Sequence, residues 1–565
     1  MTVLTLPPTT ATSLNAGRRE RELAAVAAGG PVDLLVIGGG VTGAGVALDA
    51  ASRGLSVVLA EAHDLAFGTS RWSSKLVHGG LRYLATGDVA LARESAVERD
   101  ILMRHTAPHL VRALPMLTPL TPGVPRSNAA LVQAGVWLGD LLRRGAGTPR
   151  AVLPGPRRLT AVETLGVAPA LREAGLRGGV LHWDGRLVDD ARLVVALART
   201  AAGFGARILT RLRVTGLDGG GLDGGPRGPS RHGCRGIEAT AVDTLTGTRI
   251  TLRARTVVNA TGVWAPALAP GIRLRPSRGT HLVLRSTVLA GTRAALSLPM
   301  PGERNRFALV LPQDDGRVYV GLTDVPVEEV VDVPVPDEDE IAQLLGIVSN
   351  VLATPIDPAD RLGAFAGLRP LLDTGTDHTG TDHTGTDHTG TDHTVVPHSA
   401  APRTSAARTA DLSRRHLVRT DPGGLVTVVG GKLTTYRRMA ADAVDAAVAV
   451  GDLDAGPCRT RRLGLVGAAP RSVLATVAAP RRLVERYGTE APRVLALADG
   501  DPDLLAPVAE GTPVTGAELL FAVRDEGALD PADLLDRRTR IGLAPADRRA
   551  ALGPARQLFD HTLTR

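Results

Sequence analysis

A glycine-rich turn near the start of the chain has the spacing that binds the phosphates of a dinucleotide. Gly38, Gly40 and Gly43 form the pattern G-x-G-x-x-G, and Glu61 ends the next apolar run. In such a turn the first glycine permits a tight bend, the second lets the backbone approach a pyrophosphate, and the third lets the following helix pack on the strand. An acid at the position of Glu61 binds the adenosine ribose hydroxyls. These residues predict a dinucleotide site, with a glycine turn that holds no ligand as the alternative.

A second polar, glycine-rich segment follows soon after this turn. Residues 73–84 have the sequence Ser-Ser-Lys-Leu-Val-His-Gly-Gly-Leu-Arg-Tyr-Leu. Amides and hydroxyls in such a segment line an isoalloxazine ring, so FAD is favoured over NAD, and later glycine turns would supply the other walls. Beyond the first turn, the residues expected at the cofactor are Thr69, Ser70, Ser74, Lys75, His78, Gly79, Gly80, Ala260, Thr261, Gly262, Gly431, Lys432, Leu433 and Thr434.

The hydrophobic pattern places the first turn in a β-α-β unit, with strands at residues 32–37 and 55–60 around a helix at 43–52. Three segments with strand-like apolar patterns, residues 281–284, 307–311 and 317–322, predict an antiparallel sheet that would bind substrate. Other expected strands are 207–214, 256–259 and 424–429, and other expected helices are 89–105, 190–203 and 436–450.

The predicted fold class is α/β: a Rossmann-like FAD-binding domain interleaved with an antiparallel-sheet substrate domain, followed by an α-helical C-terminal domain. A chain of 565 residues is too long for one ordinary core. The assigned segments are a disordered tail at 1–30, the FAD-binding domain at 31–105, 176–268 and 361–452, the substrate domain at 106–175 and 269–360, and the helical domain at 457–565. Residues 374–393 are four copies of Thr-Gly-Thr-Asp-His, which we expect to be a disordered insertion.

Composition limits the other partners. Two cysteines, Cys234 and Cys458, provide neither a disulfide framework nor metal-ligand spacing, so we expect no metal site and a reducing compartment. No apolar stretch reaches the roughly 20 residues that span a bilayer. A net charge of +7 favours an anionic substrate or lipid surface, with a generally basic surface as the alternative. No amphipathic helix with a strong basic face stands out.

The ordered set of motifs resembles the FAD-dependent, respiratory, quinone-linked glycerol-3-phosphate dehydrogenases over residues 31–545. The segments that carry this resemblance are 33–45, 68–84, 189–193, 258–262, 278–281, 321–324, 366–371 and 430–437. The resemblance implies that sn-glycerol 3-phosphate is oxidised to dihydroxyacetone phosphate, with hydride leaving C2 for flavin N5 and electrons passing to a membrane quinone.

The resemblance also implies roles for individual residues. His281 would be the base, assisted by Arg369, and the residues at the substrate would be Arg82, Tyr83, Arg414, Lys432 and Thr434. A dianionic phosphate needs several fixed cations, which fits this set. The family has a shorter stretch before the position of Arg414, so Arg408 and Arg403 remain alternatives to it.

Several functions stay open at this point. An oxidase that uses oxygen is the nearest alternative, followed by an amine or amino-acid oxidase of the same flavin fold and by a flavoprotein without catalysis. The expected partners are glycerol 3-phosphate, a membrane quinone and an anionic lipid surface on the inner face of the cell membrane, in a cytoplasmic, peripheral location. No motif points to nucleic acid, and a homodimer is left open.

Overall fold

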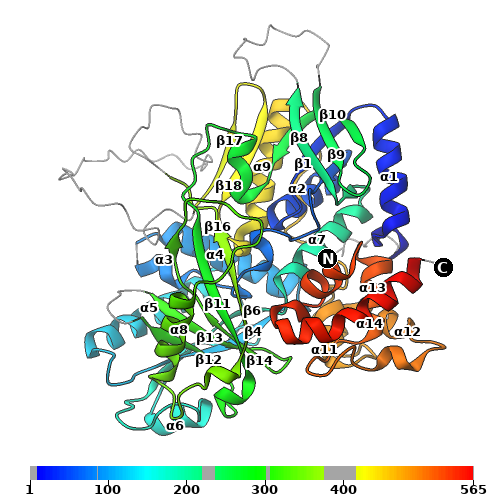
Figure 1. Ribbon diagram of the computed structural model, residues 1–565. Coiled ribbons are helices and arrows are strands. Elements are labelled where there is room, and N and C mark those ends of the chain that lie inside the picture. The colour runs from blue at the N-terminus through cyan, green and yellow to red at the C-terminus, as the bar shows by residue number, and fades with distance from the viewer. Residues whose placement is uncertain (1–8, 86, 219–235, 301–305, 374–414, 564–565) are drawn as a thin grey trace, which may run out of the picture.

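The computed structural model describes residues 9–85, 87–218, 236–300, 306–373 and 415–563. Two large sheets and a helical C-terminal region make up the molecule (Figure 1). The Thr-Gly-Thr-Asp-His repeat lies outside the described residues.

The first sheet has the strand order β17-β18-β10-β1-β2-β7, and the five strands from β18 to β7 run parallel. The strands are β1 (Val32–Ile37), β2 (Val57–Ala60), β7 (Arg207–Leu209), β10 (Arg249–Asn259), β17 (His416–Thr420) and β18 (Leu425–Gly430). In addition, β9 (Ile237–Asp243) pairs antiparallel with β10, and β8 (Leu212–Asp218) pairs antiparallel with β9. Helices α2 (Val41–Ser52), α7 (Asp190–Gly203) and α9 (Tyr436–Gly451) pack together beside it. The expected β-α-β unit is present, and its strands are almost wholly buried, as parallel strands are when elements cover both faces.

One expected strand of this sheet is divided in two. The pattern at 207–214 predicted a continuous strand, but Arg211 has φ +57° and separates β7 from β8. Because a left-handed residue cannot continue a strand, β8 turns away to pair with β9.

The second sheet has the order β15-β11-β14-β13-β12-β4-β6-β3, with β16 paired to β11 and β5 to β6. Its strands are β3 (Leu76–Val77), β4 (Val111–Pro119), β5 (Arg157–Leu159), β6 (Gly179–Leu187), β11 (Ser277–Arg285), β12 (Ala295–Pro299), β13 (Phe307–Pro312), β14 (Arg317–Gly321), β15 (Val325–Pro326) and β16 (Arg361–Arg369). All pairs are antiparallel except β12 with β4. The segments of β3, β6 and β16, which we expect in the FAD-binding domain, are hydrogen-bonded into this sheet. Such pairing joins distant segments, so local pattern does not reveal it.

Helices surround the second sheet and form the C-terminal region. They are α3 (Leu81–Ala85), α4 (Val89–Ile101), α5 (Arg126–Gly145), α6 (Ala161–Val167), α8 (Glu338–Ser349), α10 (Arg471–Leu474), α11 (Arg481–Tyr487), α12 (Ala491–Ala496), α13 (Gly516–Asp525) and α14 (Pro545–Leu563). Buried ion pairs join the C-terminal helices to the rest: Arg538 binds Asp64 at 2.7 Å, and Arg199 binds Glu490 at 2.7 Å. No helix in the described ranges is long and apolar enough to cross a membrane.

The N-terminal segment expected to be a disordered tail contains helix α1 (Ala16–Ala28), so that prediction was wrong for these residues. The side chain of Asn15 caps the first turn of the helix. Arg19 is buried and donates a 2.7 Å hydrogen bond to Asp243 at the end of β9. The charged side chain of Arg19 therefore helps to fasten the helix to the first sheet.

Candidate active site

The glycine turn between β1 and α2 has the shape that a dinucleotide phosphate requires. Gly38 has φ +110°, and a Cβ there would lie 2.6 Å from the carbonyl oxygen of Ala260. A Cβ on Gly43 would lie 1.9 Å from the carbonyl oxygen of Gly38, so neither position tolerates a side chain. Gly40 is the N-cap of α2 and provides no side-chain cap; the hydroxyl of Ser70 accepts from the amide of Val41, and the N-terminus of the helix otherwise favours an anion.

Two further walls of this cradle are formed by Glu61 and by residues 261–262, which we expect at the cofactor. The Glu61 carboxylate accepts hydrogen bonds from the amides of Gly39 and His63 at 2.6 and 2.8 Å, and burial raises the pKa of this carboxyl. Thr261 and Gly262 follow β10, and no atom lies within 4 Å of a Cβ built on Gly262. The turn, the acid and the open space beside Gly262 therefore fit FAD.

Residues 69–75 cross from this turn onto the second sheet. The hydroxyl of Thr69 donates to the carbonyl of Leu368 in β16 at 2.7 Å, while the amide of Val41 donates to the hydroxyl of Ser70 at 2.9 Å. Trp72 packs so closely on β16 that a Cβ on Gly367 would lie 2.4 Å from it. This segment links the helix N-terminus of α2 to the strands that carry the expected catalytic residues.

His281 lies within β11 and has 1% of its surface exposed. Its Nε2 is 2.9 Å from the hydroxyl oxygen of Ser74, and its ring stacks on Phe365 with centroids 4.8 Å apart. The opposite residue on β14 is Gly321, where a Cβ would lie 2.2 Å from the imidazole. A glycine at that register position therefore makes room for the ring.

Burial and two nearby positive charges keep His281 neutral. Burial, reinforced by the positive charges of Lys75 and Arg369, lowers the pKa of His281 to about 3. Its Nδ1 has no hydrogen-bond partner among the described residues. A neutral imidazole with one nitrogen on Ser74 can therefore receive a proton at the other.

The side chain of Lys75, a residue expected at the cofactor, forms a buried ion pair. Its ammonium lies 2.8 Å from Asp190 and also donates to the carbonyls of Arg71 and Ser73 at 3.1 and 3.0 Å. It lies 5.0 Å from the ring centroid of Phe365, on which His281 stacks. Burial lowers the pKa of Lys75 to about 8, although Asp190 opposes the shift.

Arg369 ends β16 and is held by three groups. Its guanidinium donates to Asp324 at 3.2 Å, to the hydroxyl of Ser277 at 3.1 Å and to the carbonyl of Thr323 at 2.9 Å. The guanidinium lies over Gly279, where a Cβ would be 2.2 Å from it. Gly279 is two residues before His281 on β11, so the guanidinium is held on the same stretch of strand as the imidazole.

A second group of expected residues gathers between α3 and α4. Lys432 follows β18; its ammonium donates to Ser95 at 2.6 Å and lies 4.1 Å from the ring centroid of Tyr83. The rings of His78 and Tyr83 have centroids 6.2 Å apart. Thr434 is buried, one residue after Leu433, in the short turn that leads into α9. Lys432 and Tyr83, expected at the substrate, are thus in contact.

The backbone of the His-Gly-Gly turn is fixed by a buried carboxylate. The amide of Gly79 donates to both oxygens of Asp184 at 3.0 and 3.1 Å, and Arg99 donates to the same carboxylate at 2.6 Å. A Cβ on Gly79 would lie 2.2 Å from Arg99, and Gly80 has φ +79°. Both glycines are therefore required by the local packing.

Not every expected residue can be placed. Arg82 lies in α3, but its side chain is outside the described part of the structure. Arg414 and its alternatives Arg408 and Arg403 also lie outside it. Gly431 has φ +68° and packs against Met439 of α9.

The sequence reasoning gave no role to three buried carboxylates: Asp184, Asp190 and Asp324. Asp190 and Asp324 stand in motifs 189–193 and 321–324, which carried the resemblance without a role for either acid. Asp184 was detectable as a charged residue within the strand-like stretch that forms β6. No cluster suited to a metal ion occurs in the ranges that the structure describes.

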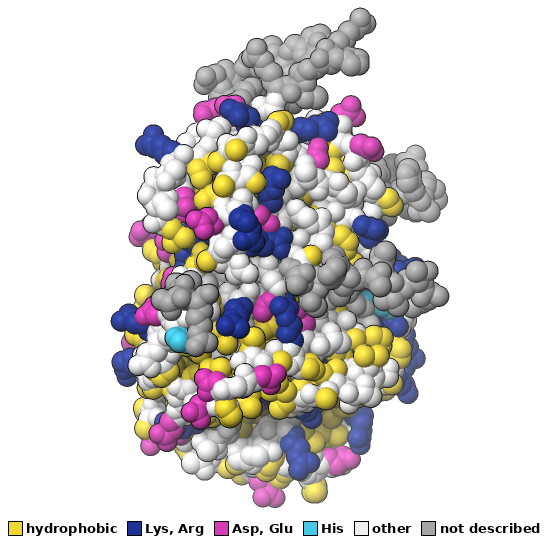
Figure 2. Space-filling model, turned by 90° about the vertical axis from the view of Figure 1, so that its right-hand side faces the viewer, with side chains coloured by type: hydrophobic (Ala, Val, Ile, Leu, Met, Phe, Trp, Pro, Cys, Tyr) yellow, Lys and Arg dark blue, Asp and Glu magenta, His cyan; other side chains and the backbone are white. Residues whose placement is uncertain are grey.

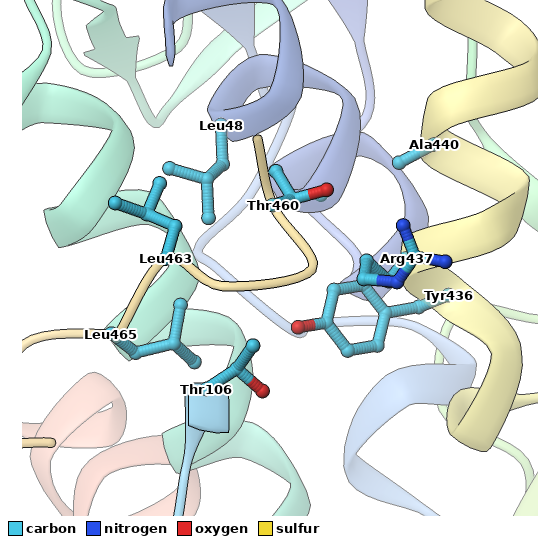
Figure 3. Close-up of a pocket in the computed structure, with 9 residues that line it drawn as sticks. Leu48, Thr106, Tyr436, Arg437, Ala440, Thr460, Leu463 and Leu465 are labelled. Atoms are coloured by element: carbon cyan, nitrogen blue, oxygen red, sulfur yellow. The ribbon is translucent and has the colours of Figure 1, made fainter. Parts of the chain in front are cut away.

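A small crevice lies apart from these residues, between α2, α9 and residues 460–465 (Figure 3). None of the expected site residues lines it. Its charged side chain, Arg437, is bound by Glu98 at 2.8 Å.

Comparison with known proteins identifies the family. Residues 33–396 match the model described as FAD dependent oxidoreductase, and residues 458–563 match that of the C-terminal domain of alpha-glycerophosphate oxidase. The chain is 49% identical to glycerol-3-phosphate dehydrogenase 1 of Mycobacterium tuberculosis, an alignment that covers 97% of this chain and 98% of the relative. The chain belongs to the FAD-dependent glycerol-3-phosphate dehydrogenase family. The family and the cofactor FAD predicted from the sequence are confirmed.

Solved structures of this fold agree with that assignment. The glycerol-3-phosphate dehydrogenase from Bacillus halodurans, complexed with FAD, has a TM-score of 0.69 and 26% identity, over 97% of this chain and 94% of that one. The L-alpha-glycerophosphate oxidase from Mycoplasma pneumoniae, with FAD bound, has a TM-score of 0.54 and 16% identity, over 77% of this chain and 99% of that one, and shows a shared fold alone. The predicted α/β fold class with a helical C-terminal domain is confirmed.

Proposed function

We propose that this protein oxidises sn-glycerol 3-phosphate to dihydroxyacetone phosphate and passes the electrons to a membrane quinone. The observation that carries the proposal is the neutral, buried imidazole of His281. It is held by Ser74, at the point where residues 69–75 reach the second sheet. The name of the relative from Mycobacterium tuberculosis supports the substrate.

His281 is the proposed base. Oxidation of a secondary alcohol releases a hydroxyl proton and a hydride, and FAD, when bound, supplies the hydride acceptor. If Nε2 of His281 donates to the hydroxyl of Ser74, the lone pair on Nδ1 is available for the substrate proton. Binding of a dianionic substrate raises the pKa of a nearby imidazole, which strengthens the base only when substrate is present.

Arg369 and Lys432 are the proposed cations for the substrate. Both are already oriented, Arg369 by Asp324 and Lys432 by Ser95, so little side-chain freedom is lost when an anion binds. Arginine also provides a planar pair of donors that can stabilise a developing alkoxide. Phosphate is favoured over the carboxylate of an amino acid because a dianion needs more than one cation.

Anaerobic stopped-flow absorbance of the flavin band tests the proposal. We expect rapid bleaching by glycerol 3-phosphate and no bleaching by glycine or sarcosine. Reoxidation far faster by a quinone than by oxygen would support the dehydrogenase, while fast reoxidation by oxygen would make the protein an oxidase.

The variant His281→Gln tests the base. We expect its bleaching rate to fall about a hundredfold or more, the usual contribution of a general base. His105→Gln, in the π-helical segment that continues α4, is the matched control and should bleach at the wild-type rate. An unchanged rate in His281→Gln would exclude His281 as the base.

A further inference from the structure

Helix α5 carries a stripe of large apolar side chains that face solvent. Leu131, Trp137, Leu138 and Leu141 are 58%, 50%, 45% and 57% exposed. At the helical rotation of about 100° per residue, positions 131, 137, 138 and 141 fall within about 120° of one another, so these side chains lie on one side of the helix. The other large exposed apolar side chains of the described residues lie singly on other elements or in the loop after β15. We call these four residues of α5 the apolar stripe.

The rest of the helix is firmly attached to the molecule, so the stripe is not a product of loose packing. Val136 is buried on the inner side, and Gly139 lies directly over Leu81 of α3. Asp140, the acidic residue of the helix, is buried and bound by Arg143 and Arg144 at 2.6 and 3.0 Å. The exposed side of α5 therefore presents no free carboxylate.

The surroundings of the stripe are strongly basic. Residues 121–160 contain Asp140 and no other acid, and their arginines are Arg126, Arg143, Arg144, Arg150, Arg157 and Arg158. All of these arginines except Arg143 are exposed. Figure 2 looks onto the opposite side of the molecule, where basic and acidic side chains are interspersed. The segment that contains α5 therefore carries an excess of positive charge, and among its exposed arginines Arg157 faces Glu163 at 3.7 Å.

We propose that α5 is the surface by which the protein docks on an anionic lipid bilayer, with the apolar stripe in the headgroup boundary. The combination of apolar side chains, a tryptophan and surrounding arginines is the one that lies stably in that layer. The sequence analysis had found no such helix. The inference deepens the proposed function by naming the surface that meets the membrane. It rests on that function in one respect, because the proposed transfer of electrons to a membrane quinone is the reason for docking.

The position of α5 explains how docking serves the site. Helix α5 packs on α3 and α4, as Figure 1 shows at the lower left of the molecule. Leu142 of α5 packs against the cluster that includes Tyr83 and Leu91, and Tyr83 is in contact with Lys432. The proposed docking surface is therefore one helix away from residues expected at the substrate, and a quinone in the bilayer would be brought to this side of the protein.

Flotation of the FAD-loaded full-length protein with lipid vesicles tests the proposal. We expect binding to vesicles of phosphatidylglycerol and phosphatidylcholine, and at least about tenfold weaker binding of the variant Trp137→Ser/Leu138→Ser/Leu141→Ser, because each apolar side chain withdrawn from water contributes several-fold. Val473→Ser/Leu505→Ser removes two exposed apolar residues of the C-terminal region and should bind as the wild type does. Dye reduction by glycerol 3-phosphate without vesicles should be unchanged in both variants.

A second variant tests the charge. Arg157→Gln/Arg158→Gln should bind anionic vesicles about 25-fold more weakly, because each arginine near such a surface contributes about fivefold in affinity. Equal binding by the wild type and the stripe variant would overturn the proposal. So would a wild type that reduces the dye but binds no vesicle, and this result would leave the proposed function intact. A wild-type dimer that the stripe substitutions convert to monomer would show that a second copy covers the stripe, and would also overturn it.

Discussion

Replacing Lys75 with methionine removes a buried charge from beneath the site while keeping an unbranched side chain of similar length. Lys75 is 2% exposed and its partner Asp190 is fully buried, so the variant leaves a carboxylate without its counter-charge. Loss of one member of a buried pair costs about 3–5 kcal/mol. Asp190 keeps hydrogen bonds from the amide and hydroxyl of Ser73 at 2.9 and 2.8 Å, so we expect the lower end, about 3 kcal/mol.

The same pair can be tested from the other side. Asp190→Asn leaves the ammonium of Lys75 with two carbonyl acceptors, and we again expect a loss of about 3 kcal/mol. The double variant should cost less than the two single losses added together, by about 2 kcal/mol, because it leaves no unpaired charge. Urea unfolding, followed by flavin fluorescence for cofactor release and by circular dichroism for the fold, measures each change. Additive losses, or a loss below about 1 kcal/mol for Lys75→Met, would show that the pair does not hold this segment.

Three other outcomes follow from the geometry. Arg369→Lys should weaken glycerol 3-phosphate binding and slow flavin bleaching about tenfold each, since an ammonium cannot reproduce the planar contacts of the guanidinium; unchanged stopped-flow traces would remove Arg369 from the site. Gly79→Ala should lower FAD retention during gel filtration, because its Cβ would lie 2.2 Å from Arg99, and full retention would mean that the turn can shift at no cost. Burial lowers the pKa of His109 to about 3 and that of His182 to about 4. As the pH drops below 6.5, these histidines are protonated in the unfolded chain but not in the folded protein, so the free energy of unfolding falls. At pH 5.5 the two together should cost about 3 kcal/mol relative to pH 7.5, and the double glutamine variant should show a correspondingly flatter pH dependence of unfolding.

Local chemistry explains which parts of this structure could be predicted from the sequence. Gly38, Gly40 and Gly43 have their roles within a few residues of chain, so the turn, its flanking strands and the helix were all predictable. The partners of His281, Lys75 and Arg369 are not local: Ser74 lies 207 residues from His281 and Asp190 lies 115 residues from Lys75. The motifs identified these positions as important without showing which side chains meet.

The N-terminal helix and α5 were missed for a different reason. Both contain arginines that a sequence pattern assigns to solvent, yet Arg19 and Arg143 are buried against Asp243 and Asp140. Periodicity alone also does not tell whether an apolar stripe faces a core or the outside. Only the packing of Val136 and Gly139 against the molecule shows which side of α5 is left uncovered.

The attachment of the C-terminal helices to Asp64 has a consequence for how the protein is made. Asp64 lies just after Glu61, but its partners Arg537 and Arg538 come 473 and 474 residues later. On the ribosome the nucleotide turn is made well before these two arginines, so the ion pairs beside it cannot form until the arginines have also emerged. The segment that follows Glu61 therefore takes its final contacts from a part of the chain that is made more than 470 residues later.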